Sequence, residues 1–269
     1  MLHVIEIDDP ADGRVADFRD LSAADRRPDR PGGRGLVIAE GVVVVRRLLD
    51  SPYPPRAVFG VRSRVDALAD DLAGIDVPAY VTSADVMDRV VGFHLNRGVL
   101  AVADRAPRPD AAELADRGGL LAVLEGVGDH ENLGSIFRNA AALGVSGVLL
   151  GPGCADPLYR RSVRVSMGHV LRVPFTTLPD WPGGLDLLRE RGFRILALTP
   201  RPDATPLGRI GRPAGPVAVM LGSEGYGLTD VALAAADELV RIPMVPGVDS
   251  LNVATAAAVA FHSLNAWDE

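Results

Sequence analysis

The sequence of 269 residues contains no lysine and only one cysteine, Cys154. A lone cysteine excludes an internal disulfide framework, and no Cys/His spacing is typical of a zinc site, so we expect no metal. No apolar run approaches the roughly 18 residues that a membrane-spanning helix needs. The N-terminal stretch MLHVIEIDDPADGR is acidic, unlike a basic leader peptide. These absences predict a soluble, unprocessed cytoplasmic protein that makes no membrane contact.

Positive charge is also scarce, because 28 basic residues face 35 acidic residues and give a net charge of −7. Neither part of the chain is basic when it is divided at Ala106. An RNA partner would therefore be bound by local patches and not by a broad basic face. All the basic residues are arginine, which suits bidentate phosphate contact and base stacking. A codon bias across the genome would produce the same lack of lysine.

Two nucleotide-binding fingerprints are missing. A phosphate loop that ends in Gly-Lys-Ser/Thr is impossible without lysine, and no GxGxxG sequence follows the first strand of an α/β unit. A nucleotide-dependent oxidoreductase on an ordinary doubly wound sheet is therefore disfavoured.

The first part of the chain predicts a polar arm followed by a small domain. Residues 1–34 are rich in Asp, Arg and Pro, and they suggest an N-terminal arm with at most a short helix near residues 14–21. From Leu36, strand-like stretches such as LVIAEG, RAVFGV and VPAYVT alternate with helix-like stretches such as VVVVRRLLDS. This alternation predicts a small α/β domain over residues 35–106. Proline, charge and glycine in residues 107–118 indicate a linker.

The second part, residues 119–269, begins with LLAVLEGV, a continuous apolar run typical of a buried parallel strand. The stretch GDHENLGSIFRNAAALG predicts a helix with Asn132 as its N-cap and Gly144 as its stop, and VSGVLL is the next strand. A parallel pair joined by this helix would place ligands at the carboxyl ends of the strands. Arg138 would then lie in the first two turns of the helix, where a cation opposes the helix dipole.

Two further strands and a terminal helix follow. FRILALTP and PVAVMLGSEGYGL read as buried strands, and the second ends in a glycine-rich loop where a backbone can approach a ligand closely. IPMVPGVDSLNVATAAAVAFHSL joins a Pro/Gly loop to an Ala-rich helix, with Ser250 and Asn252 at the junction. These two residues could form an ordinary N-cap or face a ligand.

Four arginines gather in DPLYRRSVRVSMGHVLRV, namely Arg160, Arg161, Arg164 and Arg172. They could bind phosphates or form a solvated face, and the sequence favours neither.

The order ENLGSIFRNAAALG, LGSEGYGL and IPMVPGVDSLNVATAAA resembles the three motifs of the SpoU (TrmH-type) RNA 2′-O-ribose methyltransferases of the SPOUT superfamily. The resemblance covers the chain from about Leu120 to its end. EGVVVVRRLL and FHLNRGVLAV are similar to the start and end of the substrate-binding domain that many of these enzymes carry in front. The resemblance implies a mostly parallel α/β domain with a C-terminal trefoil knot, S-adenosylmethionine as cofactor, and a homodimer formed through the knotted domain.

The resemblance also implies site residues. The implied active-site set is Asn132, Arg138, Glu224, Ser250 and Asn252. The implied cofactor-binding set is Thr199, Leu221, Gly222, Ile242, Met244 and Leu251. The family proposal makes the arginine a general base. Because a guanidinium normally stays protonated, we expect Arg138 instead to bind the phosphate beside the target ribose and to orient its hydroxyl.

The front domain favours a large structured RNA, so ribosomal RNA is the expected target. Transfer RNA is the alternative within the same reaction. A catalytically silent RNA-binding protein is a further alternative, although every residue of the implied active-site set is present.

Overall fold

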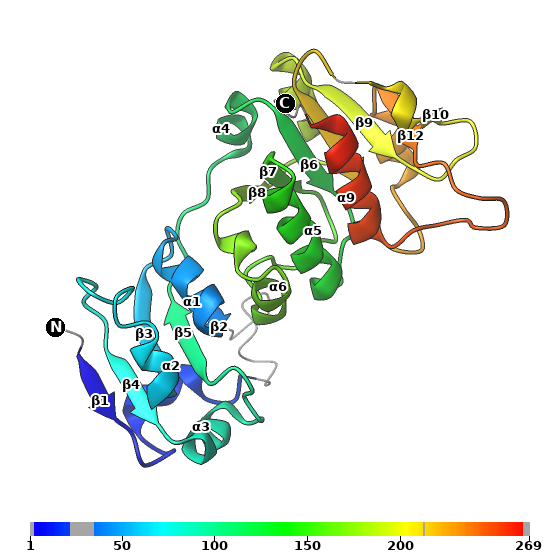
Figure 1. Ribbon diagram of the computed structural model, residues 1–269. Coiled ribbons are helices and arrows are strands. Elements are labelled where there is room, and N and C mark those ends of the chain that lie inside the picture. The colour runs from blue at the N-terminus through cyan, green and yellow to red at the C-terminus, as the bar shows by residue number, and fades with distance from the viewer. Residues whose placement is uncertain (1–2, 22–34, 212, 266–269) are drawn as a thin grey trace. The chain divides into compact units, whose positions relative to one another are not determined.

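The computed structural model describes residues 3–21, 35–211 and 213–265, and it comprises two compact units (Figure 1). Unit 1 consists of Met1–Pro107 and Asp156–Arg172, and unit 2 of Arg108–Ala155 and Val173–Glu269. Each unit is therefore built from two separate stretches of the chain. Within the described residues, no helix is both long and apolar enough to cross a membrane.

Unit 1 contains a mixed five-stranded sheet in the order β1-β4-β3-β5-β2. β1, β4 and β3 are parallel, whereas β5 is antiparallel to β3 and β2. Strands and helices alternate along it as the sequence predicts. Its elements are β1 Val4–Glu6, η1 Gly13–Phe18, β2 Val37–Glu40, α1 Val42–Leu49, β3 Pro55–Val61, α2 Arg62–Asp66, β4 Ala79–Thr82, α3 Ala84–Val91, β5 Val99–Ala103, α6 Arg160–Val165 and η3 His169–Leu171.

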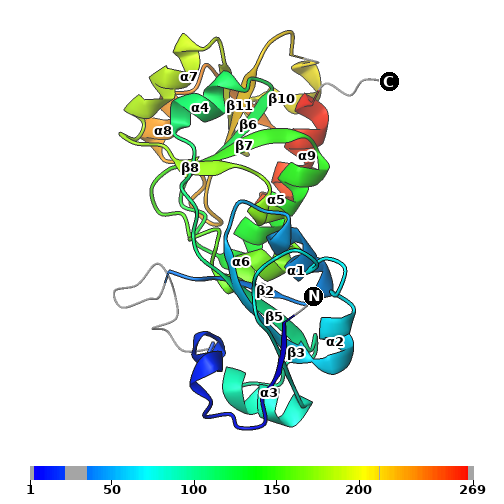
Figure 2. The same cartoon turned by 90° about the vertical axis from the view of Figure 1, so that its left-hand side faces the viewer.

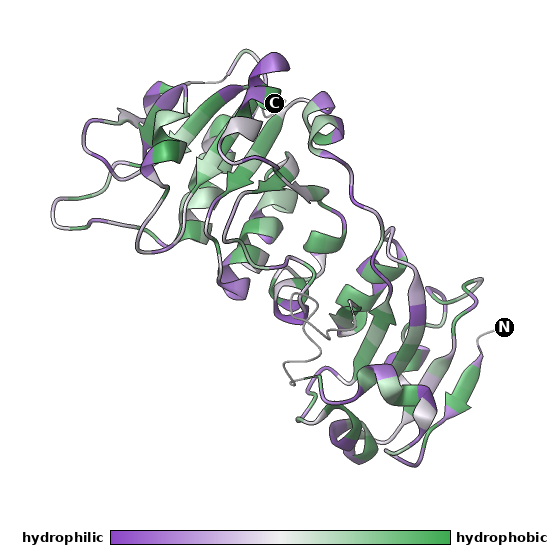
Figure 3. Cartoon of the chain, turned by 180° about the vertical axis from the view of Figure 1, so that it is seen from behind, coloured by the Kyte–Doolittle hydropathy of each residue, from purple (hydrophilic) through white to green (hydrophobic). Residues whose placement is uncertain are grey.

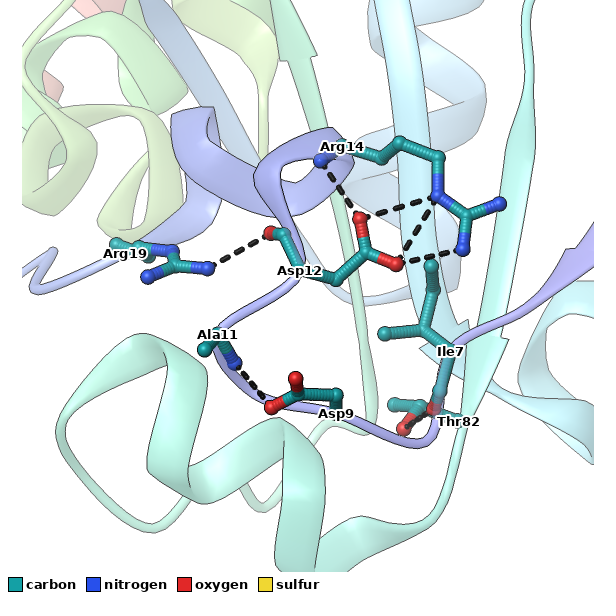
Figure 4. Close-up of polar contacts among 7 residues, drawn as sticks. All are labelled: Ile7, Asp9, Ala11, Asp12, Arg14, Arg19 and Thr82. Carbon is teal, nitrogen blue, oxygen red and sulfur yellow. Dashed lines mark hydrogen bonds and ion pairs between the residues drawn. The ribbon is translucent and has the colours of Figure 1, made fainter.

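The N-terminal segment differs from the arm predicted for residues 1–34, of which residues 1–2 and 22–34 lie outside the described residues. β1 pairs with β4 along the edge of the sheet, and Val15 and Phe18 are fully buried in the unit 1 core. Polar contacts stabilise the turn between β1 and η1, where the Asp12 carboxylate accepts from the backbone N–H and the side chain of Arg14 (Figure 4). A three-residue strand in an acidic stretch is too short to show a periodic pattern.

Unit 2 contains a seven-stranded sheet in the order β10-β12-β9-β11-β6-β7-β8, and every strand pair in it is parallel. The expected mostly parallel α/β architecture is confirmed. Its elements are α4 Ala111–Asp116, β6 Leu120–Leu124, α5 His130–Ala142, β7 Val145–Leu150, β8 Phe175–Thr177, η4 Gly183–Leu185, α7 Asp186–Glu190, β9 Arg194–Leu198, β10 Thr205–Pro206, η5 Leu207–Arg209, β11 Val217–Leu221, α8 Asp230–Ala234, β12 Glu238–Arg241 and α9 Val253–Leu264.

Helices cover both faces of the unit 2 sheet, with α4, α7 and α8 on one face and α5 and α9 on the other (Figure 2). This explains why β6 and β11 read as continuous apolar runs, since every residue of both strands is buried. Hydrophobic residues follow the strands and the inward helix faces (Figure 3). The large buried rings of Phe137 on α5 and Phe261 on α9 belong to this core.

Helix α4 lies within residues 107–118, which the sequence identifies as a linker. A capping box starts it, because the Asp110 carboxylate accepts from the Glu113 N–H and Glu113 accepts from the Asp110 N–H. Leu114 is fully buried in the unit 2 core. Residues 107–118 therefore contain part of the unit 2 core. Their charged residues and prolines indicate a linker, although one face of the helix is buried.

The arginine-rich stretch Asp156–Arg172 belongs to unit 1, although the predicted second domain, residues 119–269, includes it. Arg160 Nη1 lies 3.0 Å from an oxygen of Glu40, which is only 5% exposed at the end of β2, and the guanidinium stacks on Phe93. Arg172 pairs with Asp50 at 2.7 Å. Arg160 is thus packed into unit 1 with a buried counter-ion, which neither the phosphate nor the solvated-face interpretation anticipates, whereas the Arg172 pair lies on the surface.

Burial lowers the pKa of the Arg160 guanidinium, and Glu40 partly opposes this effect because its carboxylate stabilises the charged form. A cation is kept at this buried position because its counter-ion is buried with it.

Candidate functional site

A cavity of about 550 Å³ lies at the carboxyl ends of the unit 2 strands. Leu198 and Thr199 come from the end of β9, Leu221 ends β11, and Ile242 follows β12. The first turn of α9 closes one side. Parallel α/β sheets bind ligands at this edge because the strand ends and the following loops converge there. Its position makes this cavity the candidate ligand site of unit 2.

All six residues predicted to bind a cofactor line this cavity. They are Thr199, Leu221, Gly222, Ile242, Met244 and Leu251. Three of the five predicted active-site residues, Glu224, Ser250 and Asn252, line it as well. The wall is thus formed by three segments that are remote in sequence, and their side chains are mostly apolar or small.

The glycine-rich loop after β11 forms a tight hairpin at the mouth of the cavity. Ser223 and Gly227 exchange backbone hydrogen bonds of 3.0 and 3.2 Å, and Gly225 and Gly227 have φ angles of +92° and +70°. At Gly222, a Cβ atom would lie 2.1 Å from the backbone carbon of Gly227. Only glycine permits this close return of the loop.

Asn252 connects the three motif segments. Its side-chain amide nitrogen donates to the Asn132 side-chain oxygen at 2.8 Å and to a Glu224 carboxylate oxygen at 2.5 Å. Its side-chain oxygen accepts from the N–H groups of Ala254 and Thr255, so Asn252 is also the N-cap of α9. The amide oxygen of Asn252 therefore caps α9, and the amide nitrogen of the same side chain organises the site.

Helix α5 begins differently from the prediction. Asp129, not Asn132, is its N-cap, and the Asp129 carboxylate accepts from the N–H groups of Glu131 and Asn132 at 2.9 Å. The Asn132 side chain is consequently left to bind Asn252. Arg138 becomes the ninth residue of α5 and lies in its third turn, so the expected conflict with the helix dipole does not arise.

Arg138 and Ser250 are less engaged than the other predicted residues. Arg138 is exposed and does not line the cavity, and its side chain forms no ion pair or hydrogen bond with any residue in the described part of the chain. Ser250 is exposed, and its hydroxyl lies 3.5 Å from Asp249. The next residue on α5, Asn139, donates to the Ala254 carbonyl at 2.8 Å and ties α5 to α9.

Sequence reasoning missed Glu125, a carboxylate that is only 5% exposed at the end of β6. It accepts from Trp181 Nε1 at 2.6 Å and from the Thr229 N–H and hydroxyl at 2.8 Å. Thr229 follows the glycine-rich loop and is the N-cap of α8. Glu125 thus anchors the end of the loop that forms the cavity mouth. A charged residue that ends an apolar strand was the available signal.

Fold and site together define an α/β protein with a cavity at the carboxyl edge of a parallel sheet and a cluster of hydrogen-bonded polar side chains beside it. The SpoU rRNA Methylase family matches residues 119–262, and the chain belongs to this family. It is therefore a SpoU-type RNA methyltransferase, and this membership implies S-adenosylmethionine as the cofactor.

Similar proteins extend this result to most of the chain. An uncharacterized tRNA/rRNA methyltransferase of Mycobacterium tuberculosis is 57% identical over 97% of this chain and 91% of its own length. Two solved structures share the fold at 24% identity. An AdoMet-bound rRNA methyltransferase from Sinorhizobium meliloti has a TM-score of 0.80 and covers 97% of both chains. An RNA 2′-O ribose methyltransferase has a TM-score of 0.74 and covers 96% of this chain and 97% of its own.

Proposed function

We propose that this protein transfers a methyl group from S-adenosylmethionine to a ribose 2′-hydroxyl, preferentially in ribosomal RNA. The observation that carries the proposal is the Asn252 network, in which Asn252 joins Asn132 and Glu224 beside the cavity at the strand ends. The choice of the ribose oxygen is supported by the resemblance of the three motif segments to the 2′-O methyltransferases. The preference for ribosomal RNA is supported by the size of unit 1.

The residues of the cavity fit the proposed cofactor. Its volume lies in the range of about 300–1,000 Å³ that is usual for small-molecule sites. Leu221, Ile242, Met244 and Leu251 offer apolar contact for an adenine ring, and the backbone beside Gly222 offers hydrogen-bonding groups. We propose that these residues, with Thr199, hold the cofactor. S-adenosylmethionine supplies a methyl group activated by its sulfonium centre.

The protein must then hold the attacking hydroxyl in line and let its proton leave. Positioning alone supplies a large part of the acceleration in such a reaction. We assign this positioning to Asn252 and Ser250, which border the cavity, and to Asn132, which fixes the Asn252 amide. Glu224 accepts from the same amide, and so it orients Asn252 and not Arg138.

Arg138 is assigned to the RNA phosphate beside the target ribose. It is exposed and has no ion-pair partner among the described residues, so its five N–H donors are available. A guanidinium binds a phosphate through two parallel hydrogen bonds and remains charged throughout. Arg138 would therefore orient the substrate without accepting its proton.

We further propose a homodimer through unit 2 and a C-terminal trefoil knot around the cavity. Val259 on α9 and Val245 and Val248 on the loop before it are exposed, which suits a surface covered by a second copy. Sedimentation equilibrium tests the dimer. Pulling the chain from both ends tests the knot, because a knotted chain stops short of its full contour length.

Methyl transfer from labelled S-adenosylmethionine into total bacterial RNA tests the main proposal. The ribosomal and transfer RNA fractions are separated and digested to nucleosides, and the labelled products are identified by mass spectrometry. We expect label in a 2′-O-methylated nucleoside of ribosomal RNA. Label in a base would contradict the ribose assignment, and label in transfer RNA alone would favour the alternative target. RNA binding without transfer or cofactor binding would indicate a silent protein.

A further inference from the structure

Tyr226 is the most exposed large hydrophobic residue among those described in the structure, at 97%. It stands at the tip of the glycine-rich hairpin between Gly225 and Gly227 and lines the candidate cofactor cavity. Neither the fold nor the assigned network uses it. An aromatic side chain carries roughly 150–250 Å² of surface that is favourable to bury, so its full exposure at a ligand site requires an explanation.

The hairpin holds the backbone that carries this ring in a fixed place. The paired hydrogen bonds between Ser223 and Gly227 close the loop on one side. Thr229, two residues beyond Gly227, is held by the buried Glu125 carboxylate. Gly222 returns so closely upon Gly227 that no side chain fits between them. The backbone of Tyr226 therefore belongs to a hydrogen-bonded turn and not to an unconstrained loop.

The charges around the cavity favour a neutral ligand surface beside Tyr226. Glu224 and Asp230 line the same cavity, and the third charged residue, Arg201, is paired with Asp203. This wall is poorly suited to a phosphate, which would meet two carboxylates. A nucleobase has a neutral aromatic face, and stacking on a tyrosine ring requires no charge.

The geometry of the proposed reaction places a base at this position. The ribose hydroxyl must reach Ser250 and Asn252, which line the same cavity as Tyr226. A nucleotide that enters with its ribose leaves its base, or that of its neighbour, at the mouth. We propose that Tyr226 forms a nucleobase-stacking subsite for the methylated nucleotide or the nucleotide next to it. This proposal rests on the proposed RNA methyl transfer.

Substitution of Tyr226 tests the subsite. Tyr226→Phe and Tyr226→Trp keep an aromatic face and should retain kcat/KM for RNA, whereas Tyr226→Ala and the apolar but non-aromatic Tyr226→Leu should lower it by roughly 5- to 100-fold. Val231→Ala is the matched control, because Val231 is 57% exposed nearby in sequence but does not line the cavity. The control should match the wild type. Cofactor affinity should be unchanged in all five variants.

An RNA with one abasic nucleotide identifies the stacked base. Once the methylated ribose has been mapped, an abasic position at or next to it should weaken the wild type and remove its advantage over Tyr226→Ala. If no abasic position removes the advantage of the wild type over Tyr226→Ala, the subsite is overturned.

The other results also decide the question. Equal RNA kinetics for the wild type and Tyr226→Ala overturn the subsite and leave the proposed function standing. Weaker cofactor binding by Tyr226→Ala would make Tyr226 a cofactor contact, and loss of the dimer would make it a subunit contact. A wild type that transfers no methyl group removes the proposed function and the subsite together.

Discussion

At the residue scale, Asn252 performs two tasks that substitution can separate. Serine at this position keeps an oxygen that can cap α9, but it lacks the amide that reaches Asn132 and Glu224. Alanine lacks both groups. We expect Asn252→Ser and Asn252→Ala to lose methyl transfer to a similar degree.

The two variants should differ in stability. Asn252→Ala should lower the free energy of unfolding by about 1 kcal/mol relative to Asn252→Ser, because only the alanine variant loses the cap. Urea unfolding and labelled methyl transfer measure the two effects. Full activity in Asn252→Ser would show that the cap alone matters.

Arg138 provides a second test at this scale. Arg138→Ala should abolish methyl transfer and leave the affinity for S-adenosylmethionine nearly intact, because Arg138 does not line the cavity. Arg138→Lys keeps the charge but loses the bidentate fork, so it should be intermediate. Isothermal titration with the cofactor and turnover with RNA measure these effects. Near-normal turnover of the alanine variant would refute the assignment.

Single residues also mark the limit of sequence reasoning. Eight of the nine predicted residues that line the cavity were identified because they lie in the quoted motifs, and Thr199 is the exception. Glu125 was not identified, because its partners Trp181 and Thr229 are 56 and 104 positions away. The sequence DHEN offers two potential N-caps for α5. Asp129 is the cap, and this leaves Asn132 for the site, a choice that depends on Asn252 and is not visible locally.

At the scale of elements, the glycine-rich loop depends on the end of a neighbouring strand. Glu125→Ala leaves the Trp181 N–H and the Thr229 N–H and hydroxyl without their acceptor in a partly buried setting. We expect a loss of roughly 1–3 kcal/mol of stability, weaker cofactor binding, and a change in tryptophan fluorescence.

Two comparisons separate support of the loop from general destabilisation. Glu125→Gln keeps acceptor oxygen and size, so it should recover part of both losses. Leu114→Ala, a core change on α4 away from the cavity, should destabilise by about 2–5 kcal/mol with little effect on cofactor affinity in the folded protein. Equal cofactor affinity in Glu125→Ala and the wild type would contradict the support role.

Elements were predictable in proportion to their length and burial. β6, β7, β9 and β11 are strands of five or six mostly apolar residues, and their composition predicts them from the sequence. β1 has three residues and α4 has six, and both lie in charged stretches that suggest an arm and a linker. Tertiary burial, which no local pattern records, decides their structure.

At the scale of the whole molecule, unit 1 depends on Asp156–Arg172, a stretch that follows the first part of unit 2 in the sequence. Glu40→Gln leaves the largely buried Arg160 without its counter-ion and should cost about 3 kcal/mol or more. The exposed pair of Asp71 and Arg46 is the matched control, since Asp71→Asn should cost less than about 1 kcal/mol. Urea unfolding followed by circular dichroism measures both. Equal small losses would show that the Arg160 pair contributes no more than a surface contact.

The division of unit 1 into two stretches has a consequence for synthesis. When Pro107 leaves the ribosome, the five strands of the first sheet exist, but Arg160 and Arg172, which pair with Glu40 and Asp50, have not yet been made. Domains usually fold in the order in which they are translated. Here the first unit can be completed only after Arg172 emerges, when β6 and β7 of the second unit have already been made. The nascent chain must therefore keep two partly built units from misfolding at the same time.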